Sequence, residues 1–151
     1  MAKRIAVLSD THGLLRPEVL DAIAGCDAII HGGDINKPEI IDRLKEIAPV
    51  YVVRGNNDKA WAEHIPATLT FRIEDCRFFL VHNKKEVPKD LTDIDAVIFG
   101  HSHKYFEQMI DGRLWLNPGS CGRRRFDQEL TLAILTVDGS TLSTQKVVIQ
   151  P

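Results

Sequence analysis

Short hydrophobic runs alternate with amphipathic segments in the first third of this chain. The apolar runs at residues 4–8, 28–30 and 50–53 have the length of buried β-strands. Between them, residues 17–24 and 38–47 begin with proline and space their apolar positions as helices do. This strand and helix order predicts that the three strands pair in parallel.

After Pro66 the pattern changes to strands and turns, and no convincing helix follows. Asp111-Gly112 and Asp138-Gly139 are typical hairpin dipeptides. The most economical arrangement is an α/β fold, a four-layer αββα sandwich of two mixed β-sheets flanked by helices. The strands expected in this part span residues 69–73, 77–81, 96–99, 106–110, 113–116, 130–137 and 141–149.

The bulk composition adds few constraints. A chain of 151 residues with 44% hydrophobic and 26% charged residues suits one domain, residues 1–151. Its formal charge of −2 disfavours bulk nucleic-acid binding. The three cysteines form no CxxC pair, which argues against structural zinc and disulfide bonds. Because no signal peptide or membrane span is evident, we expect a cytoplasmic protein without membrane contact.

Five of the apolar runs end next to residues of types that bind metal ions in proteins, and this repetition is the most informative feature of the chain. Open α/β sheets place their sites at the carboxyl ends of strands. We therefore expect these residues to converge on one polynuclear metal centre. The candidate ligands are Asp10, His12, Asp34, Asn56, His82, His101 and His103.

The spacing of these residues refines the expectation. Asp10 and His12 lie two residues apart, and so do His101 and His103. In an extended chain such a pair projects to one side, so each pair could face one metal ion. Asp34 comes after two glycines that permit a tight turn, and its two carboxylate oxygens make it the candidate bridge between two cations.

The ligand types indicate which metals are expected. Oxygen and nitrogen ligands without thiolate suit Mn²⁺, Fe, Ni²⁺ or Zn²⁺ at a catalytic site, and Mn²⁺ is the leading expectation. The candidate ligands are too many for one open ion, whereas two ions roughly 3.5–4 Å apart can share them. With a bridging hydroxide the charge of such a site is about +1, which complements a phosphodiester monoanion.

Five motifs occur in order along the chain: D-x-H, G-D, G-N-x-D, H and G-H-x-H. Together they resemble the calcineurin-like metallophosphoesterases. The turn that begins at Asn117 extends the likeness to the small single-domain bacterial and archaeal phosphodiesterase branch. The resemblance implies the same two-sheet fold and in-line attack on phosphorus by a metal-bridging hydroxide, with Asp34, Asn56 and His101 in catalytic positions.

The resemblance also divides the ligands between two divalent metal ions. One ion would be bound by Asp10, His12, Asp34 and His103. The other would be bound by Asp34, Asn56, His82 and His101.

Two positions depart from the family pattern. Asn57 stands where many members have a histidine that assists the leaving group, and an amide cannot act as a general acid at neutral pH. Poor leaving groups should therefore react slowly. Asn83-Lys84-Lys85 stands where relatives often carry Gly-His, so substrate preference stays open. The two lysines either meet a phosphate or belong to a solvated loop, and the loop is favoured.

Other residues near the motifs are candidates for supporting or substrate-binding roles. His31 is expected to support Asp34 rather than to bind metal. Asp58 either orients the Asn56 loop or a ligand histidine, or it caps a turn. Arg123 is a candidate phosphate clamp, because arginine can bind two phosphate oxygens at once, with a solvated loop as the favoured alternative.

Three functions compete. The leading one is a phosphodiesterase acting on a small-molecule phosphodiester. The alternatives are a phosphomonoesterase or protein phosphatase, and a non-catalytic metal-binding interaction scaffold, since the same fold occurs as a retromer subunit that has lost some ligands. Every ligand position here holds a competent residue, including His12, which favours catalysis. An exposed edge of the late strands could support a homo-oligomer.

Overall fold

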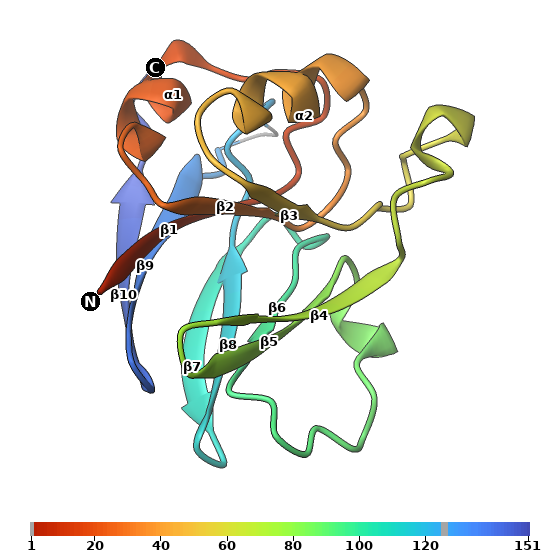
Figure 1. Ribbon diagram of the computed structural model, residues 1–151. Helices are drawn as coiled ribbons and strands as arrows, with labels where there is room; N and C mark the ends of the chain where they lie inside the picture. Colours follow the sequence, from red (N-terminus) through yellow and green to blue (C-terminus); the bar gives the residue numbers. More distant parts are fainter. Residues whose placement is uncertain (1, 125–126) are drawn as a thin grey trace.

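Two mixed five-stranded sheets face each other in the computed structural model, which describes residues 2–124 and 127–151 (Figure 1). The first sheet consists of β1 (Lys3–Leu8), β2 (Ala28–His31), β3 (Val50–Val52), β9 (Thr131–Asp138) and β10 (Thr141–Val148), in the order β10-β9-β1-β2-β3. The second consists of β4 (Thr68–Ile73), β5 (Cys76–Val81), β6 (Ala96–Ile98), β7 (Tyr105–Ile110) and β8 (Arg113–Pro118), in the order β4-β5-β6-β8-β7.

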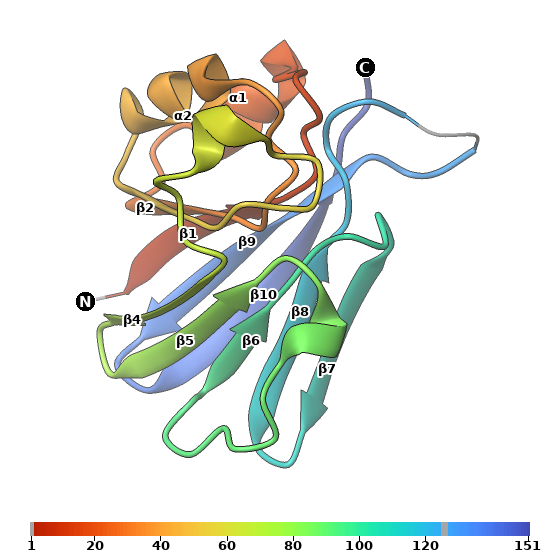
Figure 2. The ribbon, with the colours of Figure 1, turned by 90° about the vertical axis from the view of Figure 1, so that its right-hand side faces the viewer.

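Two helices cover the outer face of the first sheet (Figures 1 and 2). Both α1 (Pro17–Ile23) and α2 (Pro38–Lys45) begin with proline, whose missing N–H is unneeded in the first turn. Ile41 and Leu44 lie on the buried side of α2 and pack in the same cluster as Ile29 of β2. Among the described residues, no helix is long and apolar enough to cross a bilayer.

The strand pairing confirms the predicted parallel arrangement. β1 pairs in parallel with β2, and β2 with β3, while β5, β6 and β8 form a parallel set in the second sheet. The observed bounds lie within two residues of the predicted ones. Asp111 and Gly112 have φ values of 53° and 75°, which is the two-residue hairpin conformation that this dipeptide favours.

The last hairpin, formed by β9 and β10, does not join the second sheet, to which the preceding strands β4 to β8 belong. β9 pairs antiparallel with β1, so the chain returns to the first sheet after building the second (Figure 2). This placement was not evident from the sequence, because the alternation of apolar and polar residues indicates the length of a strand but not its partner.

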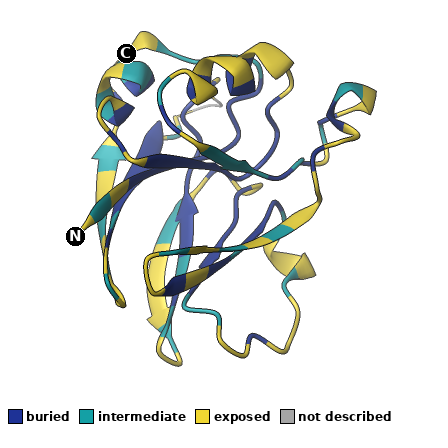
Figure 3. Ribbon diagram, in the orientation of Figure 1, coloured by how far each residue is buried: buried dark blue, intermediate teal, exposed yellow. Residues whose placement is uncertain are grey.

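The main core lies between the sheets, where Ile30, Phe78 and Leu116 are fully buried. Figure 3 shows that buried positions concentrate in the central strands, while the outward sides of the helices are exposed. A smaller cluster that includes Val97 and Leu91 covers the outer face of the second sheet. Over this cluster the described chain forms a loop with the short 3₁₀ helix Lys84–Glu86 instead of an α-helix. The predicted two-sheet α/β fold is therefore confirmed, with one thin outer layer.

Phe78 offers a test of the inter-sheet core. Its side chain is fully buried and stacks on Phe71 with ring centroids 5.2 Å apart. We expect Phe78→Ala to lower the free energy of unfolding by about 3–5 kcal/mol, measured by chemical denaturation, because it removes apolar contacts and leaves a cavity. Met109→Ala, at a position that is 62% exposed, should change it by less than about 0.5 kcal/mol. Equal losses would contradict this account of the core.

Candidate metal centre

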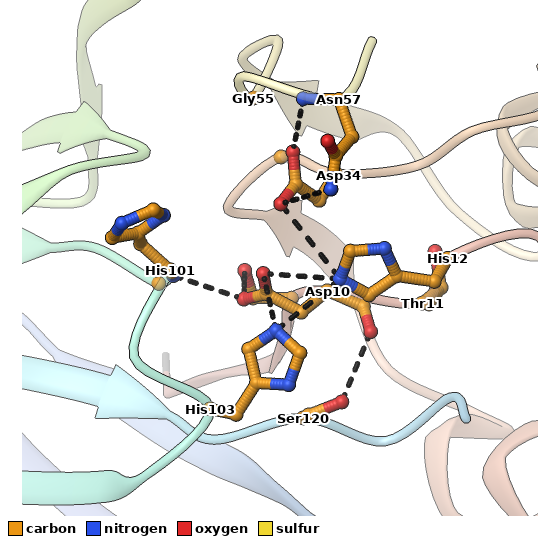
Figure 4. A network of polar contacts seen from close by, with 12 residues as sticks. Asp10, Thr11, His12, Asp34, Gly55, Asn57, His101, His103 and Ser120 are labelled. Atoms are coloured by element: carbon orange, nitrogen blue, oxygen red, sulfur yellow. Dashed lines mark hydrogen bonds and ion pairs between the residues drawn. The ribbon is translucent and has the colours of Figure 1, made fainter. Parts of the chain in front are cut away.

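The candidate ligands lie on loops that come after strands of both sheets. Asp10 and His12 follow β1, and Asp34 lies beyond the end of β2. His82 follows β5 directly, and the loop after β6 carries His101 and His103. Because the parallel strands of the two sheets end at the same edge of the sandwich, these loops meet there (Figure 4).

Asp10, His12 and His103 form one group of converging side chains. Oδ1 of Asp10 lies 3.3 Å from Nε2 of His103 and 3.7 Å from Nε2 of His12. The two histidine Nε2 atoms are 3.2 Å apart. All three residues are buried. The arrangement offers one carboxylate oxygen and two imidazole nitrogens to a common centre.

Asp34, His82 and His101 form a second group beside the first. Oδ2 of Asp34 is 3.2 Å from Nε2 of His82, and that nitrogen is 3.3 Å from Nδ1 of His101. The same Oδ2 lies 3.7 Å from Nε2 of His12 in the first group. The carboxylate of Asp34 therefore lies between the two groups, as a bridging ligand must.

The backbone that presents these side chains is not extended. Asp10, His12, Asp34, His101 and His103 have φ values of 54°, 47°, 58°, 74° and 64°, in the left-handed region that non-glycine residues seldom adopt. The expectation of extended i, i+2 pairs was therefore wrong. Asp10 and His12 still face one common centre, as expected, but His101 and His103 do not. His103 joins Asp10 and His12, whereas His101 joins Asp34. Left-handed turns aim the side chains individually, at a cost in strain.

Two glycines make room for the carboxylates. A Cβ atom on Gly55 would collide with the backbone and carboxylate of Asp34. A Cβ atom on Gly100 would lie 2.6 Å from Oδ2 of Asp10. The glycines of the G-N and G-H motifs are thus required by close approach of their backbones to the acids.

Asp58 anchors the loop that carries Asp34. Its carboxylate accepts hydrogen bonds from the backbone N–H groups of Asp34 at 3.0 Å, Ile35 at 2.9 Å, Asn36 at 2.8 Å and Gly55 at 2.8 Å. Among the roles considered for Asp58 from the sequence, these contacts favour the orientation of loops. One buried carboxylate ties the loop after β2 to the loop after β3.

His31 links two other parts of the site. Its Nδ1 accepts a hydrogen bond from the Gly33 N–H at 3.0 Å, which assigns the proton to Nε2, 3.0 Å from Oγ1 of Thr11. Burial lowers the pKa of His31 to about 4, against the opposing effect of the nearby acids. The ring is therefore neutral at pH 7. It supports the backbone before Asp34 and contributes no metal-binding nitrogen.

The two acids are ionised in spite of their burial. Burial alone raises the pKa of Asp10, but close contacts with the His103 and His12 rings outweigh this effect and hold the pKa below its usual range. Burial opposes ionisation of Asp34 as well, yet the contact with His82 outweighs it and lowers the pKa. Burial lowers the pKa of His82, but the two acids raise it above its ordinary value. The raised pKa of His82 favours a proton on this ring, whose positive charge a bound cation could supply instead.

The donor atoms fit divalent metal ions. Among the described residues, Oδ1 of Asp10 and Nδ1 of His103 are the buried side-chain polar atoms without a hydrogen-bond partner. A buried carboxylate oxygen facing three histidine nitrogens within 4 Å is well suited to a cation. Nδ1 of His82 donates to the Gly32 carbonyl at 2.7 Å, so its Nε2 is left as an acceptor for a metal.

The remaining predicted residues lie around these two groups. Asn56 is exposed and lines, with His82, a cavity of about 200 Å³. Asn57 turns toward Asp34: its backbone N–H donates to Oδ1 at 2.9 Å, and its side-chain amide lies 3.5 Å from Oδ2 (Figure 4). Nε of the exposed Arg123 donates to the His12 carbonyl at 3.0 Å, which places this side chain beside the site.

Several supporting residues were not predicted from the sequence. Oγ of Ser9 donates to Oδ2 of Asp10 at 2.7 Å, and Oγ of Ser120 donates to the Asp10 carbonyl at 3.0 Å. Nδ2 of Asn117 donates to the Gly100 carbonyl at 3.1 Å. Asn117 and Ser120 belong to the turn that was recognised by resemblance, but no sequence signal indicates their hydrogen-bond partners. Ser9 could have been inferred, because it adjoins Asp10 at the end of a strand.

Comparison with known proteins agrees with this geometry. The sequence model of the family described as the calcineurin-like phosphoesterase superfamily domain matches residues 4–140. The chain therefore belongs to this superfamily. A probable metallophosphoesterase of Methanothermobacter thermautotrophicus is 32% identical over 93% of this chain and 90% of its own length. The fold and the two Asp/His groups thus define a metal-dependent phosphoesterase.

Solved structures share the fold. A structure described as that of a novel archaeal phosphodiesterase is similar with a TM-score of 0.81 and 25% identity, and the match covers 97% of this chain and 99% of the other. The Vps29 protein of Chaetomium thermophilum has a TM-score of 0.78 at 14% identity, with 97% and 98% covered. At that identity the likeness concerns the fold alone.

Asp58 provides a test of how the ligand loops are held. Asp58→Asn keeps the shape of the side chain but replaces one accepting oxygen with an N–H donor, so some of the four backbone N–H groups lose their partner. We expect the free energy of unfolding of metal-free protein to fall by about 2–4 kcal/mol, measured by denaturant titration. Asp42→Asn, which removes the same charge from an exposed position on α2, is the matched control. Equal effects of the two changes would refute the anchoring role.

His31 predicts a specific pH dependence of stability. The unfolded chain takes up a proton on this residue near pH 6.5, whereas the folded protein resists until about pH 4. Stability from this residue is therefore present above pH 6.5 and is lost as the pH falls toward 4, by on the order of 3 kcal/mol. In metal-free protein, His31→Asn should flatten the unfolding free energy across this window relative to wild type. Parallel pH profiles would contradict the burial of a neutral ring.

Proposed function

We propose that this protein is a phosphodiesterase that uses two divalent metal ions, with Mn²⁺ the leading choice, to hydrolyse a small-molecule phosphodiester. The observation that carries the proposal is the position of the Asp34 carboxylate between the two groups of candidate ligands. The likeness to an archaeal phosphodiesterase supports the choice of diester over other phosphate esters.

The protein side chains would act mainly by positioning. Asp10, His12 and His103 would hold one ion, and Asp34, His82 and His101 the other, with Asn56 at the open side of the second group. When bound, two such ions lower the pKa of a coordinated water and neutralise charge on a phosphoryl oxygen.

Asn57 lies beside the bridging carboxylate without supplying a proton. Its backbone and side-chain N–H groups face the two oxygens of Asp34. A neutral amide donates hydrogen bonds but does not release a proton at neutral pH. The leaving group of the ester must therefore depart without a general acid from this position.

The charge of the site favours a diester. Two divalent cations exceed the two negative charges of Asp10 and Asp34, and the remaining acid nearby, Asp58, has its carboxylate directed to backbone N–H groups. A modest positive charge suits a monoanionic diester better than it suits a dianionic monoester. A non-catalytic metal-binding scaffold of the same fold is the second candidate, and the complete set of candidate ligands in both groups favours catalysis over it.

Hydrolysis of a bis-aryl phosphodiester tests the proposal. We expect chelator-treated protein to be inactive, and added Mn²⁺ to restore turnover. Asp34→Asn should reduce that turnover by about a hundredfold or more, because the bridge between the two ions loses its charge. Dialkyl esters should react far more slowly than diaryl esters, since Asn57 supplies no general acid for a poor leaving group. Asp42→Asn serves as the control for loss of a surface charge.

The same assay separates the alternatives. A strong preference for aryl monoesters over aryl diesters would indicate a phosphomonoesterase. Stoichiometric metal binding without turnover, with Mn²⁺ or with other divalent ions, would favour the interaction scaffold.

A further inference from the structure

Lys84 makes a contact that the reaction does not explain. Its Nζ atom lies over three aromatic rings on the outer face of the second sheet, 4.9 Å from the ring centroid of Phe106 and 5.7 Å from those of Phe99 and Trp115. All three distances fall within the limit of about 6 Å for a cation–π interaction. Lys84 was expected to belong to a solvated loop. That expectation is incomplete, because the ammonium group contacts three aromatic rings of the second sheet and its loops.

The rings bracket a loop of the metal centre. Phe99 is the first residue of the loop that carries His101 and His103, and Phe106 lies in β7, the strand that follows this loop. Lys84 lies only two residues after His82. A single ammonium thus joins the segment after one candidate ligand to both ends of the loop that carries two others.

Other contacts make this connection stiff. The backbone N–H of Gly100 donates to the His82 carbonyl at 3.0 Å. Oδ1 of Asn83 accepts from the Lys85 N–H at 3.0 Å and so caps the short helix Lys84–Glu86. The segment that carries Lys84 is therefore held at its start by one backbone hydrogen bond and the Asn83 side-chain cap, while the ammonium of Lys84 contacts the aromatic rings.

We propose that Lys84 is a positioning residue of the metal centre, which fixes His82 relative to His101 and thereby sets the affinity of the second ion. The facing atoms, Nε2 of His82 and Nδ1 of His101, are 3.3 Å apart. The first group takes only His103 from the loop between β6 and β7, and its Asp10 and His12 follow a strand of the first sheet, so it depends less on this contact. The inference rests on the proposed two-metal site.

Calorimetric titration of metal-free protein with Mn²⁺, together with the thermal midpoint, tests the role. Lys84→Met keeps the length of the side chain and removes its charge, whereas Lys84→Arg keeps a cation for the rings. We expect Lys84→Met to weaken one of two bound ions by roughly tenfold and the other by clearly less, with Lys84→Arg close to wild type. Lys85→Met, which removes the charge of the adjacent exposed lysine, should bind both ions as wild type does.

The outcomes are distinguishable. Wild-type affinities for both ions in Lys84→Met would overturn the positioning role, and so would equal weakening in Lys84→Met and Lys85→Met. A lower thermal midpoint with both ions weakened alike would show that Lys84 serves only general stability and would also overturn it. Wild-type protein that binds fewer than two ions would overturn the proposed function itself.

Discussion

Two ionised carboxylates buried at one edge of a β-sandwich are the constraint on which the rest of this structure depends. Asp10 and Asp34 are both buried, so the surrounding loops must supply positive groups or hydrogen-bond donors to stabilise their charges. Histidines from both sheets surround them, and hydroxyl or backbone N–H groups satisfy the oxygen atoms that the histidines do not. The site is therefore held together by the charges that it must also offer to metal ions.

The buried residues that support the candidate ligands have defined hydrogen-bond partners of their own. Asp58 is a third buried acid, yet its carboxylate accepts four hydrogen bonds from backbone N–H groups, which distinguishes its role from that of Asp34. His31 is a buried histidine that stays neutral and connects backbone segments. Residue types alone do not distinguish these two from ligands. Their hydrogen-bond partners do, because each has its polar atoms directed to the main chain or to Thr11 and away from the common centre.

Much of the fold could be predicted from the sequence, because hydrophobic periodicity and turn dipeptides are local signals. Parallel pairing of the first three strands and the Asp111-Gly112 hairpin followed from them directly. Strand partners are not local, so the return of β9 to β1 could not be foreseen. At the site, positions at strand ends identified which residues converge, but the assumption of extended pairs failed because left-handed backbone conformations redirect individual side chains. The contact of Lys84 with three rings joins residues far apart in sequence and has no local signature.

The insertion of β9 beside β1 has a consequence for the order of events during folding. The Asp10 loop comes after β1, and Ser120, which donates to the Asp10 carbonyl, lies on the connection that leads to β9. A growing chain therefore carries its first candidate ligands long before the strand that flanks them has been synthesised. Because contacts between such distant segments form late, the complete constellation exists only in a nearly finished molecule. The hydrogen bond from Ser120 and the pairing of β1 with β9 therefore complete the surroundings of Asp10 only after more than a hundred further residues have been added to the chain.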